Sequence, residues 1–361
     1  MKKNSIILIL AVLIITLSIV LLEKQKVSPT IIQVDETIPL KEGKFPKAPE
    51  LQGIKGYINT DENIKISELK NKVVLIDFWT YTCINCIRTL PHLKEWDKKY
   101  RDKGLVIIGV HTPEFTFEKD YNNVLDAVNE FNIEYPVVQD NDYATWSAFK
   151  NRFWPRKYLI DAEGFIRYDH IGEGGYLETE NIIQELLSEI GKDITDMDLS
   201  EVQNLTPNKE TRTPELYAGF NFNLPRGQDI GNEEGIQPSK IIDYKLPEKK
   251  IKPDIIYLKG PWLNNPDDLK SQGESSIVLG FTARSVNIVA DSTQTEMEVL
   301  INGNYISKEL AGDDVQFDED RSFILVDTPK LYNVVRGDHG THTLELKVNS
   351  NDFFYSAFTF G

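Results

Sequence analysis

The sequence predicts an α/β domain with a mixed sheet and helices on both faces, followed by an all-β sandwich or jelly-roll domain, behind a single N-terminal transmembrane helix. The prediction rests on an uncharged N-terminal run, alternating strand and helix patterns up to about residue 190, and short β-type runs after about residue 214. With 361 residues, the chain is long enough for two domains. Its formal net charge of −16 argues against a nucleic-acid partner.

The first 22 residues predict a signal anchor that stays attached to the protein. An uncharged run from Asn4 to Leu22 follows Lys2 and Lys3, and it approaches the roughly 20 residues that a helix needs to span a bilayer. The run is longer than the apolar part of a signal peptide and lacks an A-x-A cleavage site, although a removed signal peptide is the alternative. The leading lysines place the body outside the cytoplasm, in the periplasm or at the cell exterior. Residues 23–44, which are polar and broken by prolines, are expected to form a tether.

The α/β domain is expected over residues 45–190. Short apolar runs typical of buried strands alternate with segments of helical spacing, which implies a mixed sheet covered on both faces. The expected elements are strands at 73–78, 105–110 and 136–138, helices at 85–100, 121–131, 142–149 and 179–190, and hairpins at 55–66 and 157–170. The last helix is expected to start near Thr179 or Glu178.

The β-sandwich domain is expected over residues 214–361, after a polar linker at 191–213. Short runs rich in Val, Ile, Phe and Tyr are separated by turn residues, a pattern typical of antiparallel sandwiches and jelly rolls. The expected strands are 276–281, 286–290, 297–301, 323–326, 342–348 and 353–360.

The only two cysteines, Cys83 and Cys86, lie three positions apart, between a buried strand and a helix. The unpaired N–H groups and the positive end of the helix dipole favour thiolate over thiol at Cys83. Two intervening residues let Cys86 reach Cys83, so Cys83 is expected to attack a substrate disulfide and Cys86 to resolve the mixed disulfide. Half of a zinc site and a short structural clip are the alternatives. No cofactor or metal is expected.

Around the cysteines, the sequence resembles the thioredoxin superfamily through Asp77-Phe-Trp79, Cys83-Ile-Asn-Cys86, Pro91 and Trp154-Pro155. The resemblance implies that Asp77 is a buried acid that relays a proton to or from Cys86, the third catalytic residue beside the two cysteines. The apolar run around Asp77 also favours a function, because an unpaired buried carboxylate is costly. The resemblance further implies that Pro155 is a cis-proline facing the cysteines and that Trp154, Pro155 and Trp79 bind substrate.

A closer resemblance is to TlpA-like and DipZ-like proteins, over roughly residues 45–361, and it is carried by 78–91, 109–115, 154–161 and the end of the chain. It implies a membrane-tethered, extracytoplasmic thiol–disulfide oxidoreductase that reduces or isomerises disulfides in exported proteins. DipZ proteins often carry a multi-helix electron conductor, whereas this chain has one hydrophobic segment. Electrons are therefore expected from a separate membrane donor or a small thiol.

Several alternatives stay open at this point. The alternative to an oxidoreductase is an exported glycan- or partner-binding protein, or a copper chaperone that uses the same cysteines. Thr80-Tyr-Thr-Cys83 also superficially matches a thiol peroxidase, but Ile76 occupies the position of the expected proline. The C-terminal domain of DipZ-like proteins resembles a carbohydrate-binding module, so four residues there form either a glycan platform or core and turns: Tyr257, Trp262, Asn264 and Asn265.

Two histidines and one glutamate also lie near the cysteines in the sequence. His111 and Glu114 either border the cysteines or pack within their loop, and His92 is expected on the surface of its helix.

Overall fold

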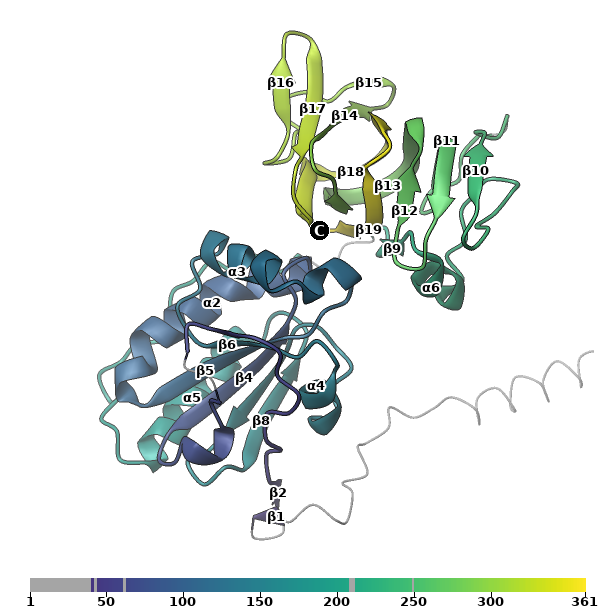
Figure 1. Ribbon diagram of the computed structural model, residues 1–361. Helices are drawn as coiled ribbons and strands as arrows, with labels where there is room; N and C mark the ends of the chain where they lie inside the picture. The colour runs from purple at the N-terminus through teal and green to yellow at the C-terminus, as the bar shows by residue number, and fades with distance from the viewer. Residues whose placement is uncertain (1–39, 42–43, 61–62, 208–211, 249) are drawn as a thin grey trace, which may run out of the picture. The chain divides into compact units, whose positions relative to one another are not determined.

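A computed structural model of the protein describes residues 40–41, 44–60, 63–207, 212–248 and 250–361 (Figure 1). The chain forms two compact units, residues 1–47 and 48–361. In the first unit, β1 (Leu40–Lys41) pairs antiparallel with β2 (Phe45–Pro46). The predicted anchor at residues 1–22 lies outside the described residues, as does most of the predicted tether. Within the described ranges, no helix is long and apolar enough to cross a membrane.

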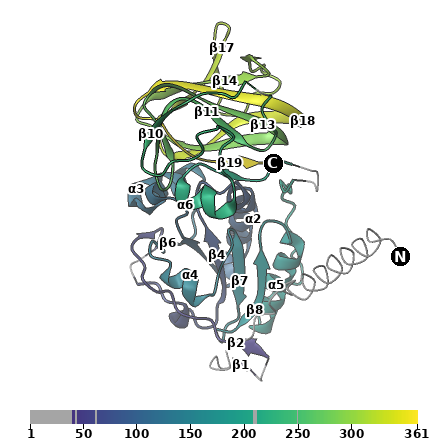
Figure 2. The ribbon, with the colours of Figure 1, turned by 90° about the vertical axis from the view of Figure 1, so that its right-hand side faces the viewer.

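The second unit contains a mixed sheet whose strands, among the described residues, follow the order β3-β6-β5-β4-β7-β8 (Figures 1 and 2). The strands are β3 (Tyr57–Ile58), β4 (Val73–Trp79), β5 (Leu105–His111), β6 (Val137–Gln139), β7 (Arg156–Ile160) and β8 (Ile166–Ile171). The central strand β4 pairs parallel with β5 and antiparallel with β7. This arrangement confirms the predicted thioredoxin-like α/β domain with a mixed sheet.

Helices cover both faces of this sheet. Side chains along a strand point alternately to opposite faces, so β4 contributes to a core on each face. Val73, Leu75 and Trp79 of β4 join one core with side chains of α2, α3 and α5. Val74, Ile76 and Phe78 join a second core, against which Trp146 of α4 packs. The helices are α2 (Ile84–Tyr100), α3 (Tyr121–Glu130), α4 (Ala144–Ala148) and α5 (Tyr176–Glu189), with short 3-10 helices η1 (Ile66–Glu68), η2 (Arg101–Lys103) and η3 (Thr116–Lys119). The alternation places Asp77 on the face that α2 covers.

Two predicted elements of this part are corrected by the structure. The hairpin expected at residues 55–66 is wrong, because β3 pairs with β6 and residues 66–68 form η1. The last helix, α5, starts at Tyr176, three positions before Thr179. Gly175 precedes it with a φ of 61°, and the Thr179 hydroxyl donates a hydrogen bond to the Gly175 carbonyl, so it lies inside the first turn and does not cap it.

The rest of the second unit is β-rich, as predicted. In the described part of the chain, eleven strands form one antiparallel sheet with the main order β10-β11-β12-β19-β13-β18-β14-β17-β16. Nine of the eleven lie in this order; of the other two, β9 pairs with β19 and β15 pairs with β14. The strands are β9 (Leu216–Tyr217), β10 (Ile241–Tyr244), β11 (Ile256–Asn264), β12 (Leu269–Ser271), β13 (Gly273–Asp291), β14 (Thr295–Ile301), β15 (Asn304–Tyr305), β16 (Gln316–Asp318), β17 (Arg321–Val326), β18 (Lys330–Ser350) and β19 (Phe354–Phe360), with α6 (Phe220–Asn223) and η4 (Leu224–Arg226) after β9.

The two longest strands of this sheet are β13 and β18, which pair with each other along most of their length (Figure 2). The predicted strands 276–281 and 286–290 are both parts of β13, because register shifts near Ala283 and Val286 absorb the irregular residues between them. Side chains of this sheet, such as Trp262, Phe281 and Tyr355, form one buried hydrophobic cluster. A β-rich domain is thus confirmed, while its division into two packed layers stays a prediction.

We expect Leu93→Ala to lower the free energy of unfolding by about 2–5 kcal/mol, because Leu93 of α2 is fully buried and the substitution leaves a cavity. Urea unfolding followed by circular dichroism measures the change. Leu177→Ala on α5 is the matched control, since 63% of Leu177 is exposed. Similar losses in the two variants would contradict the assigned core.

Candidate redox site

The first turn of α2 holds Cys83 at the helix cap. β4 ends at Trp79, and the chain makes a short turn in which the Cys83 N–H donates to the Thr80 carbonyl at 3.3 Å. Cys83 then takes an extended conformation, and its Sγ accepts a hydrogen bond from the Cys86 N–H at 3.3 Å. A helix start supplies unpaired N–H groups and a positive partial charge, and both stabilise a thiolate. The predicted position of Cys83 at the cap is therefore confirmed.

The two sulfurs differ in their access to solvent. Both cysteines are free thiols; Cys83 is half-buried, whereas Cys86 is only 1% exposed. Burial raises the pKa of the Cys86 thiol well above its usual range, and hydrogen bonding with Cys83 and the Cys83 charge raise it further. Cys83 is therefore the sulfur that an external disulfide can reach, while Cys86 stays protonated behind it.

Asp77 lies buried on β4, beneath the helix that carries the cysteines. Burial raises the pKa of its carboxyl to about 7, and the positive charge of Lys157 opposes this rise. No described residue donates a hydrogen bond to Asp77 Oδ1. The Asp77 charge in turn contributes to the raised pKa of Cys86. A carboxyl that titrates near neutrality beside a protonated thiol is suited to accept and return its proton.

Lys157 is a second buried charge, which sequence reasoning did not single out. It pairs with Asp77 in the register of β4 and β7, it is fully buried, and its Nζ donates to the Gly172 carbonyl at 3.1 Å. Burial lowers the pKa of the Lys157 ammonium, while the charges of Asp77, Cys86 and Glu173 oppose this change. In the sequence, Lys157 could have been noticed as a lysine within the strand-forming run 156–160. Its partner, however, depends on the pairing register of two distant strands.

The residues expected to bind substrate have different environments. The Trp154–Pro155 peptide bond is cis, as predicted. Trp154 is half-buried, packs against Trp146 in a tilted arrangement with 4.3 Å between ring centroids, and lines the same cavity of about 70 Å³ as Cys83. Trp79, in contrast, has no exposed surface and packs edge-on against His111. Direct contact between Trp79 and a substrate has no support in this geometry, so we omit Trp79 from the proposed substrate surface.

The structure gives His111 and Glu114 different environments. His111 is fully buried, its Nε2 lies 3.3 Å from the Thr80 hydroxyl, and burial lowers its pKa to about 3, so it is a neutral packing residue. Glu114 lines the cavity that contains Cys83. Its neighbour Glu118 is fully buried and accepts a hydrogen bond from Thr82, the residue before Cys83, at 2.6 Å. Sequence reasoning missed Glu118.

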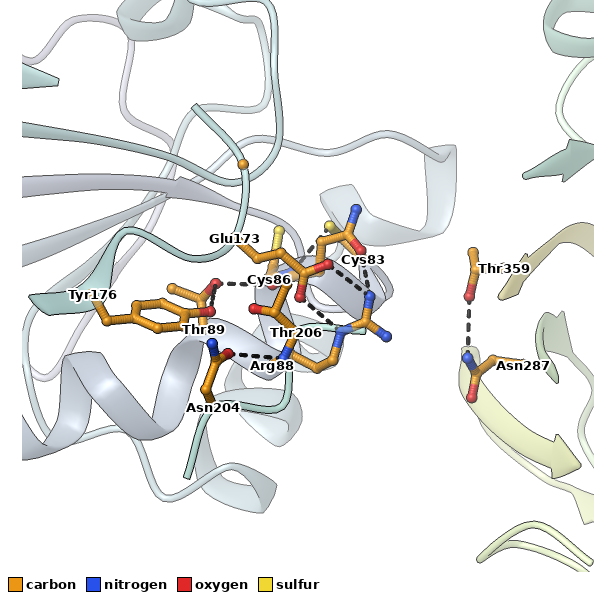
Figure 3. Close-up of polar contacts among 12 residues, drawn as sticks. Cys83, Cys86, Arg88, Thr89, Glu173, Tyr176, Asn204, Thr206, Asn287 and Thr359 are labelled. Carbon is orange, nitrogen blue, oxygen red and sulfur yellow. Dashed lines mark hydrogen bonds and ion pairs between the residues drawn. The ribbon is translucent and has the colours of Figure 1, made fainter. Parts of the chain in front are cut away.

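An ion pair that sequence reasoning also missed holds the first turn of α2. Arg88 is largely buried, and it donates from Nε and one terminal nitrogen to the two carboxylate oxygens of Glu173, at 2.8 and 2.9 Å. The same nitrogen donates to Asn85 Oδ1 at 2.6 Å. Figure 3 shows the pair between Arg88 and Glu173. Two parallel bonds between a guanidinium and a carboxylate fix geometry as well as add energy. This pair ties the cysteine turn to the loop after β8.

The predicted surface position of His92 is wrong. His92 is only 5% exposed, because its ring stacks on Tyr176 with centroids 3.5 Å apart. Of the two interpretations of the residues in the β-rich part, the structure favours core positions over a glycan platform for Tyr257, Trp262 and Asn264, which are buried. Trp262 Nε1 donates to the Lys259 carbonyl, so the ring belongs to the core of the β-rich sheet.

We expect Asp77→Asn to stabilise the protein, by an amount that grows with pH. The folded carboxyl has a pKa of about 7 against an ordinary value of 3.8, so the folded state holds a proton that the unfolded state releases between these values. Wild-type stability therefore falls as pH rises from about 4 to 7, and the neutral amide of the variant removes this loss. We expect a gain on the order of 2–4 kcal/mol at pH 8 and little gain at pH 4. Urea unfolding at the two pH values measures it, and a pH-independent difference would contradict a raised Asp77 pKa.

The chain is similar to known proteins over both of its parts. The family described as AhpC/TSA matches residues 46–169, and the family described as thioredoxin-like C-terminal domain matches residues 213–361. Protein DipZ of Mycobacterium bovis is 36% identical over 320 residues, which cover 87% of this chain and 43% of the relative, so the chain spans less than half of that protein. The thiol–disulfide oxidoreductase YkuV of Bacillus subtilis is 30% identical over 141 residues, which cover 39% of this chain and 94% of the relative.

A solved structure, a thiol–disulfide isomerase from Corynebacterium glutamicum, matches with a TM-score of 0.34 and 22% identity, over 39% of this chain and 97% of the other. The AhpC/TSA match over residues 46–169 contains the paired cysteines, and the DipZ match covers 87% of the chain. The chain belongs to the TlpA/DipZ-like family of thioredoxin-fold thiol–disulfide oxidoreductases.

Proposed function

We propose that this protein is a membrane-tethered, extracytoplasmic thiol–disulfide oxidoreductase that reduces or isomerises disulfides in exported proteins. The observation that carries this proposal is the difference between its sulfurs: a half-buried Cys83 at a helix start and a buried Cys86, whose pKa is raised by burial and in part by the charge of Asp77. One sulfur is available for attack, and the other is kept for resolution.

The proposed reaction runs through a mixed disulfide. The Cys83 thiolate attacks one sulfur of the substrate disulfide, whose other sulfur leaves with the electron pair. Cys86 then attacks Cys83 Sγ while its proton passes to the Asp77 carboxylate, the substrate thiolate leaves, and a Cys83–Cys86 disulfide remains. A pKa of about 7 lets Asp77 accept this proton and release it again near neutral pH. A second dithiol must reduce the enzyme before the next cycle.

A protein substrate is supported by the surroundings of the first turn of α2. Trp154 and Cys83 line the small cavity, and the backbone at Trp154 and Pro155 is proposed to pair with an extended substrate segment. A larger cavity of about 800 Å³ lies along the same turn and includes Ile84, Ile87 and Arg88 in its lining. Its volume is in the range that a drug-sized ligand or a few side chains occupy.

The electron donor and the location of the protein are part of the same proposal. Residues 1–22 serve as the membrane anchor and residues 23–44 as the tether of a domain at 45–190, which the linker 191–213 joins to a β-sandwich domain at 214–361. The oxidised pair needs a second dithiol before the next cycle, and a separate membrane donor or a small thiol is proposed to reduce Cys83 and Cys86.

We expect Cys86→Ser to accumulate a covalent complex between Cys83 and its substrates, because the mixed disulfide loses its resolving sulfur. Non-reducing electrophoresis followed by mass spectrometry identifies the partners, and dithiothreitol should release them. Cys83→Ser is the matched control and should form no complex. Cys83→Ser that still reduces insulin at the wild-type rate would instead favour a binding protein over an oxidoreductase.

We expect a membrane-impermeant maleimide added to intact cells to label Cys83, because the proposed orientation places it outside the cytoplasm. Labelling before and after reduction gives the fraction of oxidised protein. A reductase should hold most of its cysteines reduced, since its donor must keep it ready for attack. Labelling only after cell lysis would contradict the orientation, and largely oxidised cysteines would contradict the direction.

A further inference from the structure

The β-rich part contributes side chains to the cavity in which Cys83 lies. This cavity of about 70 Å³ is lined on one side by residues such as Thr82, Cys83 and Glu114. On the other side it is lined by residues near β9 and on β13 and β19, namely Glu215, Tyr217, Val289, Ala357 and Thr359. Phe115 beside Glu114 joins Tyr217, Val289 and Ala357 in one small hydrophobic cluster, which fixes this contact.

Within this cavity, one hydroxyl lies between two carboxyl groups. Tyr217 OH donates to Glu114 Oε1 at 2.9 Å and lies 3.4 Å from Glu215 Oε2. A phenol has one proton to donate, so it serves one carboxylate well and leaves the other unpaired. Burial raises the pKa of both carboxyl groups. The charges of Arg212, Arg226 and Arg88 oppose this rise at Glu215, which is also the more exposed of the two, so Glu114 is the carboxyl that gains more from holding a proton.

The charges around Glu114 agree with this assignment. Burial and the nearby charges of Glu118 and Glu215 raise the pKa of Glu114 to about 8, against the lowering effects of the Tyr217 hydroxyl and Arg226. Arg226 itself lies over the Tyr217 ring, 4.3 Å from its centroid. The Glu114 charge also raises the pKa of Tyr143, before α4. At neutral pH, Glu114 is therefore mostly a neutral acid on the wall of the Cys83 cavity.

We propose that Glu114 is the proton donor to the thiolate that leaves when Cys83 attacks a substrate disulfide, and that Tyr217 of the β-rich part is its positioning residue. This inference rests on the proposed function. It gives the β-rich part a role in the chemistry, because that part holds the acid in place next to the reacting sulfur.

The proton and electron balance of this step is complete. In the resting reduced protein, Glu114 is already a carboxylic acid, and Cys83 releases its own proton to solvent before it attacks. The Cys83 thiolate forms a bond to one substrate sulfur, the substrate S–S bond breaks, and its electron pair stays on the second sulfur. Glu114 then gives its proton to this second sulfur, either directly or through one water molecule in the cavity, becomes a carboxylate, and takes up a proton from water before the next cycle. Cys83 is oxidised to the mixed disulfide level and one substrate sulfur is reduced to a thiol.

The test compares two disulfides whose leaving groups differ in their need for a proton. The full chain carrying Cys86→Ser isolates the first step, and Glu114→Gln is added to it. Glutathione disulfide has an alkyl thiolate leaving group, so we expect Glu114→Gln to slow its reaction by about 10- to 100-fold. The aromatic thiolate of 5,5′-dithiobis(2-nitrobenzoate) leaves without a proton, so its reaction should change by about twofold at most. Glu201→Gln, at an exposed position, is the matched control and should leave both rates unchanged.

A pH profile tests the positioning role separately. The glutathione disulfide rate should stop rising, and then fall, near the Glu114 pKa of about 8, and this limb should be absent in Glu114→Gln. Tyr217→Phe removes a hydrogen bond to the carboxylate, so the limb should move to higher pH, whereas Tyr305→Phe on the exposed strand β15 should not move it. If Glu114→Gln does not fold, as judged by thermal unfolding, the shift in Tyr217→Phe carries the test.

Two results would overturn the inference and leave the proposed function standing. One is an equal slowing of both disulfides in Glu114→Gln, which would mean that Glu114 acts on the Cys83 thiolate or on the fold. The other is a selective loss in Glu215→Gln with none in Glu114→Gln, which would assign the proton to the other carboxyl. A protein with native Glu114 that reacts with neither disulfide would instead contradict the proposed function itself.

Discussion

The site depends on a carboxyl group buried between the central strand and the helix that carries the cysteines. Burying an ionised group costs several kcal/mol unless a partner of opposite charge or a bound proton compensates for it. Asp77 has both means, since Lys157 faces it across the strand pair and its own pKa lies near 7. The thiol of Cys86 lies in the same low-dielectric region, and its pKa is raised by burial and by the Asp77 charge. The three groups form one set in which the protonation of each depends on the others.

The features that follow from short stretches of sequence were predicted well. The apolar run of β4, the helical spacing of α2 and the cysteine pair between them place Cys83 at a helix start, and alternation along β4 places Asp77 beneath that helix. The short strand-type runs after residue 213 likewise predicted the β-rich part. Features that depend on distant pairing were not predicted. Lys157 becomes a partner of Asp77 only through the register of two strands, and Tyr217 meets Glu114 across 103 positions of sequence.

The corrected predictions share a physical origin. A tryptophan or histidine within an amphipathic pattern has both a polar atom and a large apolar surface, so sequence alone does not fix its side of the protein. His92 was expected near solvent and Trp262 had both a glycan-platform and a core interpretation; both are buried because an aromatic neighbour covers the ring. The merging of two predicted strands into β13 has a related cause, since a bulge permits irregular residues within one continuous strand.

The loop after β8 connects the buried cation to the cysteine helix. The Gly172 carbonyl accepts a hydrogen bond from Lys157, and the Glu173 carboxylate accepts two from Arg88. The Gly175 carbonyl accepts one from the Thr179 hydroxyl at the start of α5. Gly172 and Gly175 both have positive φ, so side chains there would strain the backbone. This four-residue segment thus acts as a mechanical brace. A substitution in this segment, which lies far from both cysteines in the sequence, would therefore move the first turn of α2 and the Lys157 ammonium together.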